Sequence, residues 1–208
     1  MIFLLLAITV CTSALAETRI NVLQLPDLNE WDTEIFSGET NYEVINLDGK
    51  PLLKAHSESS ASGLVRKIDI DLTKTPYMNW SWKVDNILND IDETKKSGDD
   101  YAARIYVVIS GGLLFWRTRA ISYSWTSVQP EGQHWPNAFT ENALMISMQS
   151  GDEQVGQWVN EKRNVLQDIK NLLGLDKTEI NAVAIMTDTD NSKQSATAYY
   201  GDIFFTGQ

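Results

Sequence analysis

Short segments with an alternating or continuous apolar pattern recur along the chain from residue 42 onward, and residues typical of turns separate them. Because successive side chains of a β-strand point to opposite faces, segments of this length and pattern predict strands. We predict strands at residues 42–47, 51–56, 64–72, 77–84, 101–109, 114–124, 143–150, 180–187 and 199–205. Many short strands spaced by turns predict a mainly β protein.

One segment has the pattern of an amphipathic helix instead. Between residues 159 and 173 apolar side chains recur at helical spacing, and Gly174 follows where a C-terminal cap is expected. An amphipathic helix needs a surface to pack on. The predicted fold is therefore a jelly-roll β-sandwich with one late amphipathic helix packed on it, and the alternative is a two-layer α+β fold with the helix on an open sheet.

The first 16 residues have the composition of a cleavable secretory signal. An apolar run at residues 2–10 precedes small and polar residues and Ala14-Leu15-Ala16. The run is shorter than the roughly 20 apolar residues of a transmembrane helix. We predict a signal peptide at 1–16, a single β-sandwich domain at 17–208, and a periplasmic or secreted protein. Cys11, the only cysteine, lies in the signal, so the mature chain offers neither disulfides nor thiolate metal sites.

The mature chain is strongly acidic, since the whole formal net charge of −11 lies after residue 16. Phosphate backbones repel such a chain, and no cluster of Lys and Arg with interleaved aromatic residues offsets the repulsion. The sequence therefore argues against nucleic-acid binding and against an anionic membrane surface. No later apolar segment is long enough for membrane insertion.

Several longer motifs stand out in the chain: W-S-W-K-V at 80–84, G-D-D-Y-A-A-R-I-Y-V-V at 98–108, E-K-R-N-V at 161–165, M-T-D-T-D-N at 186–191 and Y-G-D-I at 200–203. Together they resemble a bacterial exported family that is known as a domain of unknown function. The family's pattern is similar to jelly-roll domains of the galactose-binding type, many of which bind glycans. That resemblance implies a fold and leaves the activity open.

Common catalytic motifs are absent from the sequence. His56 and His134 lie in neither a nucleophile motif nor a metal motif, which argues against histidine-centred hydrolysis. Two positioned carboxylates suffice for glycoside chemistry. Among 28 acidic residues a pair at the right separation arises by chance, so their abundance alone indicates nothing.

Residues 188–192, with the sequence D-T-D-N-S, place oxygen-bearing side chains at alternate positions, as calcium loops do. Lys193 and Tyr199 stand where an EF-hand has Gly and Glu. Asp and Asn are also common in ordinary turns because their side chains bind the neighbouring backbone. We favour a structural turn, and the alternative is a calcium site with Asp188 and Asp190 as ligands. No other cofactor is predicted.

Asp100, Arg104 and Tyr106 share one face of the strand predicted at 101–109, because alternate residues point the same way. A polar row on an otherwise apolar strand needs partners. In one interpretation Arg104 forms a buried ion pair with Asp100 or Asp188, and in the other the row faces a ligand. We favour the ion pair, since buried charges are usually paired.

Arg117, Tyr123 and Trp125 fall on one face of the next segment if its strand is regular. Flat aromatic faces can stack on the C–H groups of sugar rings, while Arg, Asn and Asp bind the hydroxyls. The chain has seven tryptophans, and the candidates for such stacking are Tyr123, Trp116, Trp125 and Trp135. The alternative is burial in the core, which we expect for Trp80, Trp82 and Trp158.

The leading hypothesis is a non-catalytic, exported β-sandwich that binds a glycan or another envelope ligand near residues 99–104 and 188–191. The predicted ligand-binding residues are Asp100, Arg104, Tyr106, Arg117, Tyr123, Trp125, Asp188 and Asp190. A second hypothesis, from a different class, is a glycan-acting hydrolase or lyase that uses a carboxylate pair with Arg or Tyr. A third is an envelope protein that binds only protein partners.

Overall fold

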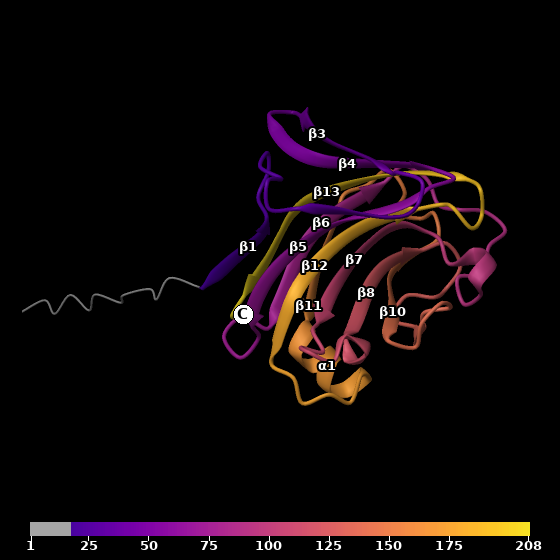
Figure 1. Ribbon diagram of the computed structural model, residues 1–208. Coiled ribbons are helices and arrows are strands. Elements are labelled where there is room, and N and C mark those ends of the chain that lie inside the picture. Colours follow the sequence, from indigo (N-terminus) through magenta and orange to yellow (C-terminus); the bar gives the residue numbers. More distant parts are fainter. Residues whose placement is uncertain (1–17) are drawn as a thin grey trace, which may run out of the picture.

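Two β-sheets stacked face to face make up the protein in a computed structural model that describes residues 18–208 (Figure 1). The strands are β1 (Arg19–Leu23), β2 (Asp32–Ser37), β3 (Asn41–Leu47), β4 (Lys50–Glu58), β5 (Ala61–Asp71), β6 (Tyr77–Val84), β7 (Tyr101–Ile109), β8 (Arg119–Thr126), β9 (His134–Pro136), β10 (Ala143–Ser150), β11 (Val159–Asn164), β12 (Glu179–Asp188) and β13 (Ser195–Thr206). The helix α1 spans Val165–Leu172. The predicted signal peptide, 1–16, lies outside the described residues.

The strand order within each sheet mixes segments that are distant in sequence. The six-stranded sheet has the order β11-β6-β13-β4-β3, with β1 also paired to β13. The seven-stranded sheet has the order β2-β5-β12-β7-β8-β10-β9. All pairs of these strands are antiparallel except β8 with β10. The predicted jelly-roll β-sandwich with one late helix is confirmed.

The core between the sheets is rich in aromatic rings. β6 alternates as predicted, so Trp80 and Trp82 point inward, with their ring centroids 5.4 Å apart in an edge-on contact. Trp80 reaches Tyr123 of the opposite sheet at 5.6 Å, and Trp82 reaches Trp125 at 6.0 Å. Offset and edge-on ring contacts of this kind add to the stabilisation from burial. They tie β6 of one sheet to β8 of the other.

The predicted helix at 159–173 is wrong in its first six residues. Residues 159–164 form the edge strand β11, which pairs with β6 from Val159 opposite Trp82 to Asn164 opposite Tyr77. The helix begins only at Val165, where the Asn164 side chain accepts a hydrogen bond from the Gln167 N–H at 3.0 Å. The long-range pairing with β6 overrides the local helical pattern. In the part of the chain from residue 18 onward, no helix is long and apolar enough to cross a membrane.

The strand predicted at 114–124 begins late. Gly111 O accepts from Leu114 N at 3.2 Å, and a short 3-10 turn at Phe115–Arg117 follows before β8 starts at Arg119. The sequence analysis also missed β1, β2 and β9. β2 is exposed along most of its length and β9 has three residues, so neither carries a clear alternating pattern.

Candidate functional site

An open cleft of about 550 Å³ lies on the outer face of the seven-stranded sheet. Its floor comes from β5, β7 and β12, and its walls come from β2 and from the loops at 137–143 and 190–191. Small side chains along the floor leave the space open; these are Ala61, Gly63 and Ala184. A hollow of similar volume, about 590 Å³, lies on the six-stranded sheet near Ser81 and Gly201. Arg104 and Asp188, which are buried and have polar atoms without hydrogen-bond partners, lie in the first cleft. The first cleft is therefore the candidate site.

Arg104 and Asp188 form an ion pair in this cleft, as the favoured interpretation of the sequence predicted. Arg104 Nη2 donates to Asp188 Oδ2 at 2.5 Å, and both side chains are buried. The pair forms because β7 and β12 are neighbours in register, with Arg104 opposite Met186. The guanidinium also lies 4.8 Å from the ring centroid of Tyr101 and 5.4 Å from that of Tyr106.

The ion pair leaves polar atoms without partners. Among residues 18–208, nothing hydrogen-bonds to Nε and Nη1 of Arg104 or to Oδ1 of Asp188, although all three atoms are buried. Such atoms cost stability unless a ligand or an ordered water completes them. The floor of the cleft thus carries two donors and one acceptor that no atom of residues 18–208 satisfies.

Burial dominates the electrostatics of the site. It raises the pKa of Asp188 well above its usual range, against the opposing effect of the Arg104 guanidinium. It also raises the pKa of Tyr106 to about 12. The pKa of Asp190 is raised by burial and then by the neighbouring charge of Asp100.

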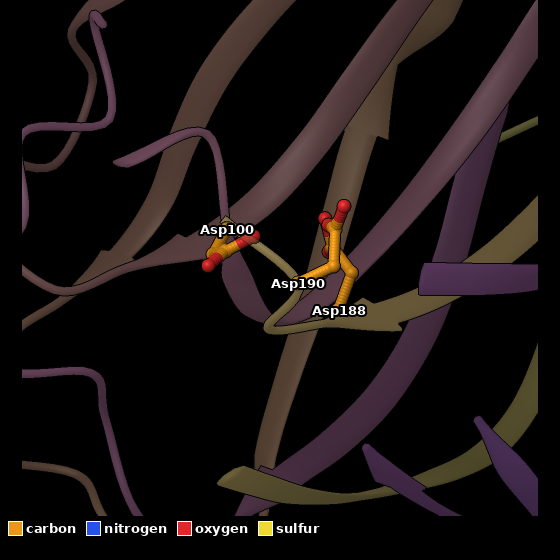
Figure 2. Close-up of side chains that lie close together, drawn as sticks. All are labelled: Asp100, Asp188 and Asp190. Atoms are coloured by element: carbon orange, nitrogen blue, oxygen red, sulfur yellow. The ribbon is translucent and has the colours of Figure 1, made fainter. Parts of the chain in front are cut away.

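Asp100 and Asp190 join Asp188 in a cluster, in which one carboxylate oxygen of each residue lies within 4.8 Å of the others. Figure 2 shows the carboxylates of Asp188 and Asp190 side by side. Asp100 immediately precedes β7. Asp100 accepts from Asn191 N at 3.2 Å and from Ser192 N at 2.5 Å, which fastens the turn after β12.

Three carboxylates so close together have the chemistry to hold a hard cation such as calcium. The contacts favour the structural turn instead. Arg104 already compensates Asp188, and backbone N–H groups already occupy both oxygens of Asp100. Asp188 and Asp190, the calcium ligands of the alternative interpretation, belong to this cluster.

Four of the predicted ligand-binding residues do not line the cleft: Asp100, which lies beside it in the cluster with Asp188 and Asp190, and also Arg117, Tyr123 and Trp125. Tyr123 and Trp125 are buried between the sheets, where Tyr123 donates to Asp168 Oδ2 at 2.8 Å. Arg117 lies in the 3-10 turn before β8. The irregular start of this segment breaks the expected alternation, and the side of β8 that carries Tyr123 and Trp125 faces the core.

The tryptophans divide between core and surface differently from the prediction. Trp80, Trp82, Trp125 and Trp135 are buried, whereas Trp158 is 38% exposed and Trp116 is 56% exposed. The expectation that Trp158 fills the core is wrong. Within residues 18–208, no tryptophan lines the cleft.

The sequence analysis missed two phenylalanines of the cleft. Phe36 on β2 is 70% exposed, and Phe139 in the loop after β9 is 55% exposed. Phe139 stands in a polar loop, where an exposed aromatic ring is unusual, and this was the available signal. The same wall holds Asp99, which accepts from Asn137 Nδ2 at 2.9 and 2.8 Å.

Comparison with known proteins identifies a family and a fold. The family model described as protein of unknown function (DUF3047) matches residues 29–204. No curated protein matches the sequence. Solved structures with the same architecture include a family 11 carbohydrate-binding module of a cellulosomal cellulase of Clostridium thermocellum, with 13% identity, a TM-score of 0.51, and coverage of 94% of this chain and 97% of the module.

Two further structures are similar. A family 30 carbohydrate-binding module of another cellulosomal cellulase of Clostridium thermocellum has 11% identity, a TM-score of 0.50, and coverage of 92% of this chain and 98% of the module. The endoglucanase Cel12A of Rhodothermus marinus has 10% identity, a TM-score of 0.46, and coverage of 91% and 99%. At these identities the likeness to the two carbohydrate-binding modules shows the sandwich fold alone.

Proposed function

The chain belongs to the DUF3047 family of proteins of unknown function, and on that premise we propose that it is an exported, non-catalytic β-sandwich that binds a glycan in the cleft of the seven-stranded sheet. The observation that carries the proposal is the Arg104–Asp188 pair with its unused donors and acceptor. A sugar hydroxyl both donates and accepts a hydrogen bond. Neighbouring hydroxyls of one sugar ring can therefore satisfy both members of such a pair together.

The aromatic residues of the cleft support the same ligand class. Phe36 and Phe139 are large apolar side chains left exposed on the cleft walls. Ligand sites typically combine apolar and aromatic walls with a few placed polar groups. Stacking on the C–H face of a sugar ring would cover these rings, while Arg104 and Asp188 bind the hydroxyls. The fold shared with two carbohydrate-binding modules agrees with this proposal.

A hydrolase is the second candidate, because Asp188 is a carboxyl with a raised pKa in an open cleft. A general acid must be protonated before the reaction. The guanidinium at 2.5 Å favours the ionised carboxylate, which opposes that role. Burial outweighs this effect in the pKa of Asp188, so the assays below distinguish binding from catalysis.

Isothermal titration calorimetry of residues 17–208 against neutral, amino and acidic oligosaccharides of plant and bacterial walls tests the proposal. Phe36→Ala and Phe139→Ala should each weaken binding about 5- to 30-fold, corresponding to about 1–2 kcal/mol for a lost stacking contact, without a change in Tm. Leu113→Ala, which truncates an exposed apolar side chain of another loop, is the matched control and should bind normally.

Absence of binding across the whole panel would refute the proposal. Release of new reducing ends during incubation, lost in Asp188→Asn, would establish the hydrolase instead.

A further inference from the structure

The ionised groups of the cleft are mostly acidic. One guanidinium, that of Arg104, faces four lining carboxylates, which belong to Glu34, Asp99, Asp188 and Asp190. Asp100 adds a fifth carboxylate nearby, through the cluster with Asp188 and Asp190. The charge of the cleft is therefore negative even when the Arg104–Asp188 pair is counted as neutral.

The single guanidinium keeps unused hydrogen-bond donors but offers little net charge to an acidic ligand. Arg104 is buried and its charge is compensated by Asp188 at 2.5 Å. Lys96 lies close to the cleft wall, with its ammonium 5.4 Å from the ring centroid of Phe139, and offsets one of the five carboxylates. A carboxylate or sulfate group that entered the floor would lose water and gain a compensated cation in return.

Asp99 and Asp190 have uncharged hydrogen-bond partners. Asp99 accepts from the amide of Asn137 and from Tyr101 Oη at 3.2 Å. Asp190 accepts from the Asn191 amide at 3.1 Å. These donors hold the carboxylates in place and leave their charge in the cleft.

We infer that the ligand of this cleft is a glycan without acidic groups, and that an amino sugar binds more tightly than its neutral counterpart. The inference rests on the proposed glycan site and specifies its ligand class. An ammonium group on the sugar gains attraction from Asp99 and Asp190, whereas a uronate is repelled by the same groups. Repulsion between like charges also excludes wrong ligands, so the acidic wall acts as a specificity filter.

Three β-1,4-linked glucose-type hexasaccharides with one backbone test the inference. One is neutral, the second carries ammonium groups at C2, and the third carries carboxylates at C6. Calorimetry of residues 17–208 at low and high salt should give the tightest binding for the ammonium sugar. The affinity for the uronate should be lower than that for the neutral sugar by roughly tenfold or more. The preference for the ammonium sugar should shrink at high salt.

Two variants with the same change in net charge distinguish the effect of a cleft carboxylate from the effect of the overall acidity of the protein. Asp190→Asn removes one carboxylate of the cleft, and Asp176→Asn removes one exposed carboxylate in the loop after α1. Both change the net charge equally. Asp190→Asn should reduce the ratio of ammonium to neutral affinity several-fold, and Asp176→Asn should leave it unchanged.

Two results overturn the inference while leaving glycan binding intact. One is equal or tighter binding of the uronate, and the other is an equal effect of the two variants on the affinity ratio. Absence of binding by all three sugars instead counts against the proposed glycan site itself.

Discussion

Replacement of Arg104 by methionine removes the positive member of the buried ion pair and keeps a side chain of comparable length. Asp188 is then left buried with neither of its oxygens bonded to a cation. Breaking a buried pair in this way costs about 3–5 kcal/mol, because the remaining charge is uncompensated. For a domain of this size each kcal/mol corresponds to about 2–4 °C, so we expect Tm to fall by about 6–20 °C at neutral pH.

The loss should depend on pH in a defined direction. Arg104 is the nearby charge that lowers the pKa of Asp188, so its removal raises that pKa further above the usual range. A carboxyl whose pKa is raised in the folded state stabilises the fold below its unfolded pKa, and that contribution is lost as pH rises through the folded pKa. The Tm deficit of Arg104→Met should therefore be large near neutral pH and shrink in acid.

Thermal unfolding followed by circular dichroism at several pH values measures this effect. Two comparisons make it specific. Asp188→Asn added to Arg104→Met removes the orphaned charge and should recover much of the Tm. Lys95→Met removes a cation from the exposed pair with Asp92, at 2.9 Å, and should change Tm little. The reasoning would be refuted if the loss of Tm in Arg104→Met equals that in Lys95→Met, or if it does not vary with pH.

Three further predictions concern other parts of the sandwich. Asp168→Ala removes the acceptor of Arg163, which is 32% exposed, and of the buried Tyr123 hydroxyl. Urea unfolding should therefore show a free energy of unfolding lower by about 1–3 kcal/mol, and an unchanged value would contradict a structural role for this network. Burial raises the pKa of Glu93, so its contribution to stability is present in acid and lost as pH rises. Glu93→Gln should therefore match or exceed the wild-type Tm at pH 7 and lose that advantage near pH 4. A Tm of Glu93→Gln below that of the wild type at pH 7 would refute this sign. Millimolar calcium should leave Tm unchanged, because Arg104 already compensates Asp188, and a rise of several degrees would instead establish the alternative metal site.

Much of the fold follows from side-chain periodicity alone. The strands at Tyr77–Val84, Tyr101–Ile109 and Ala143–Ser150 have the predicted bounds, because alternation along a strand is a local property. The same alternation correctly grouped Arg104 with Tyr106 on one face of β7, and both line the cleft.

The tertiary structure decided which partner and which face each segment found. Pairing with β6 turned residues 159–164 from a predicted helix into an edge strand. The stacking of the sheets placed Tyr123 and Trp125 in the core and left Phe36 and Phe139 in the cleft.

Local pattern specifies that a strand has two different faces, but the choice of the buried face depends on segments distant in sequence. The Arg104–Asp188 pair shows the limit clearly. The sequence indicated that Arg104 needed an acidic partner and left Asp100 and Asp188 as alternatives, and the register of β7 against β12 selected Asp188, 84 residues away. Sequence thus determined the elements and the kinds of side chain they carry. Their convergence into a cleft came from strand pairing, whose energy depends on the whole assembled sandwich.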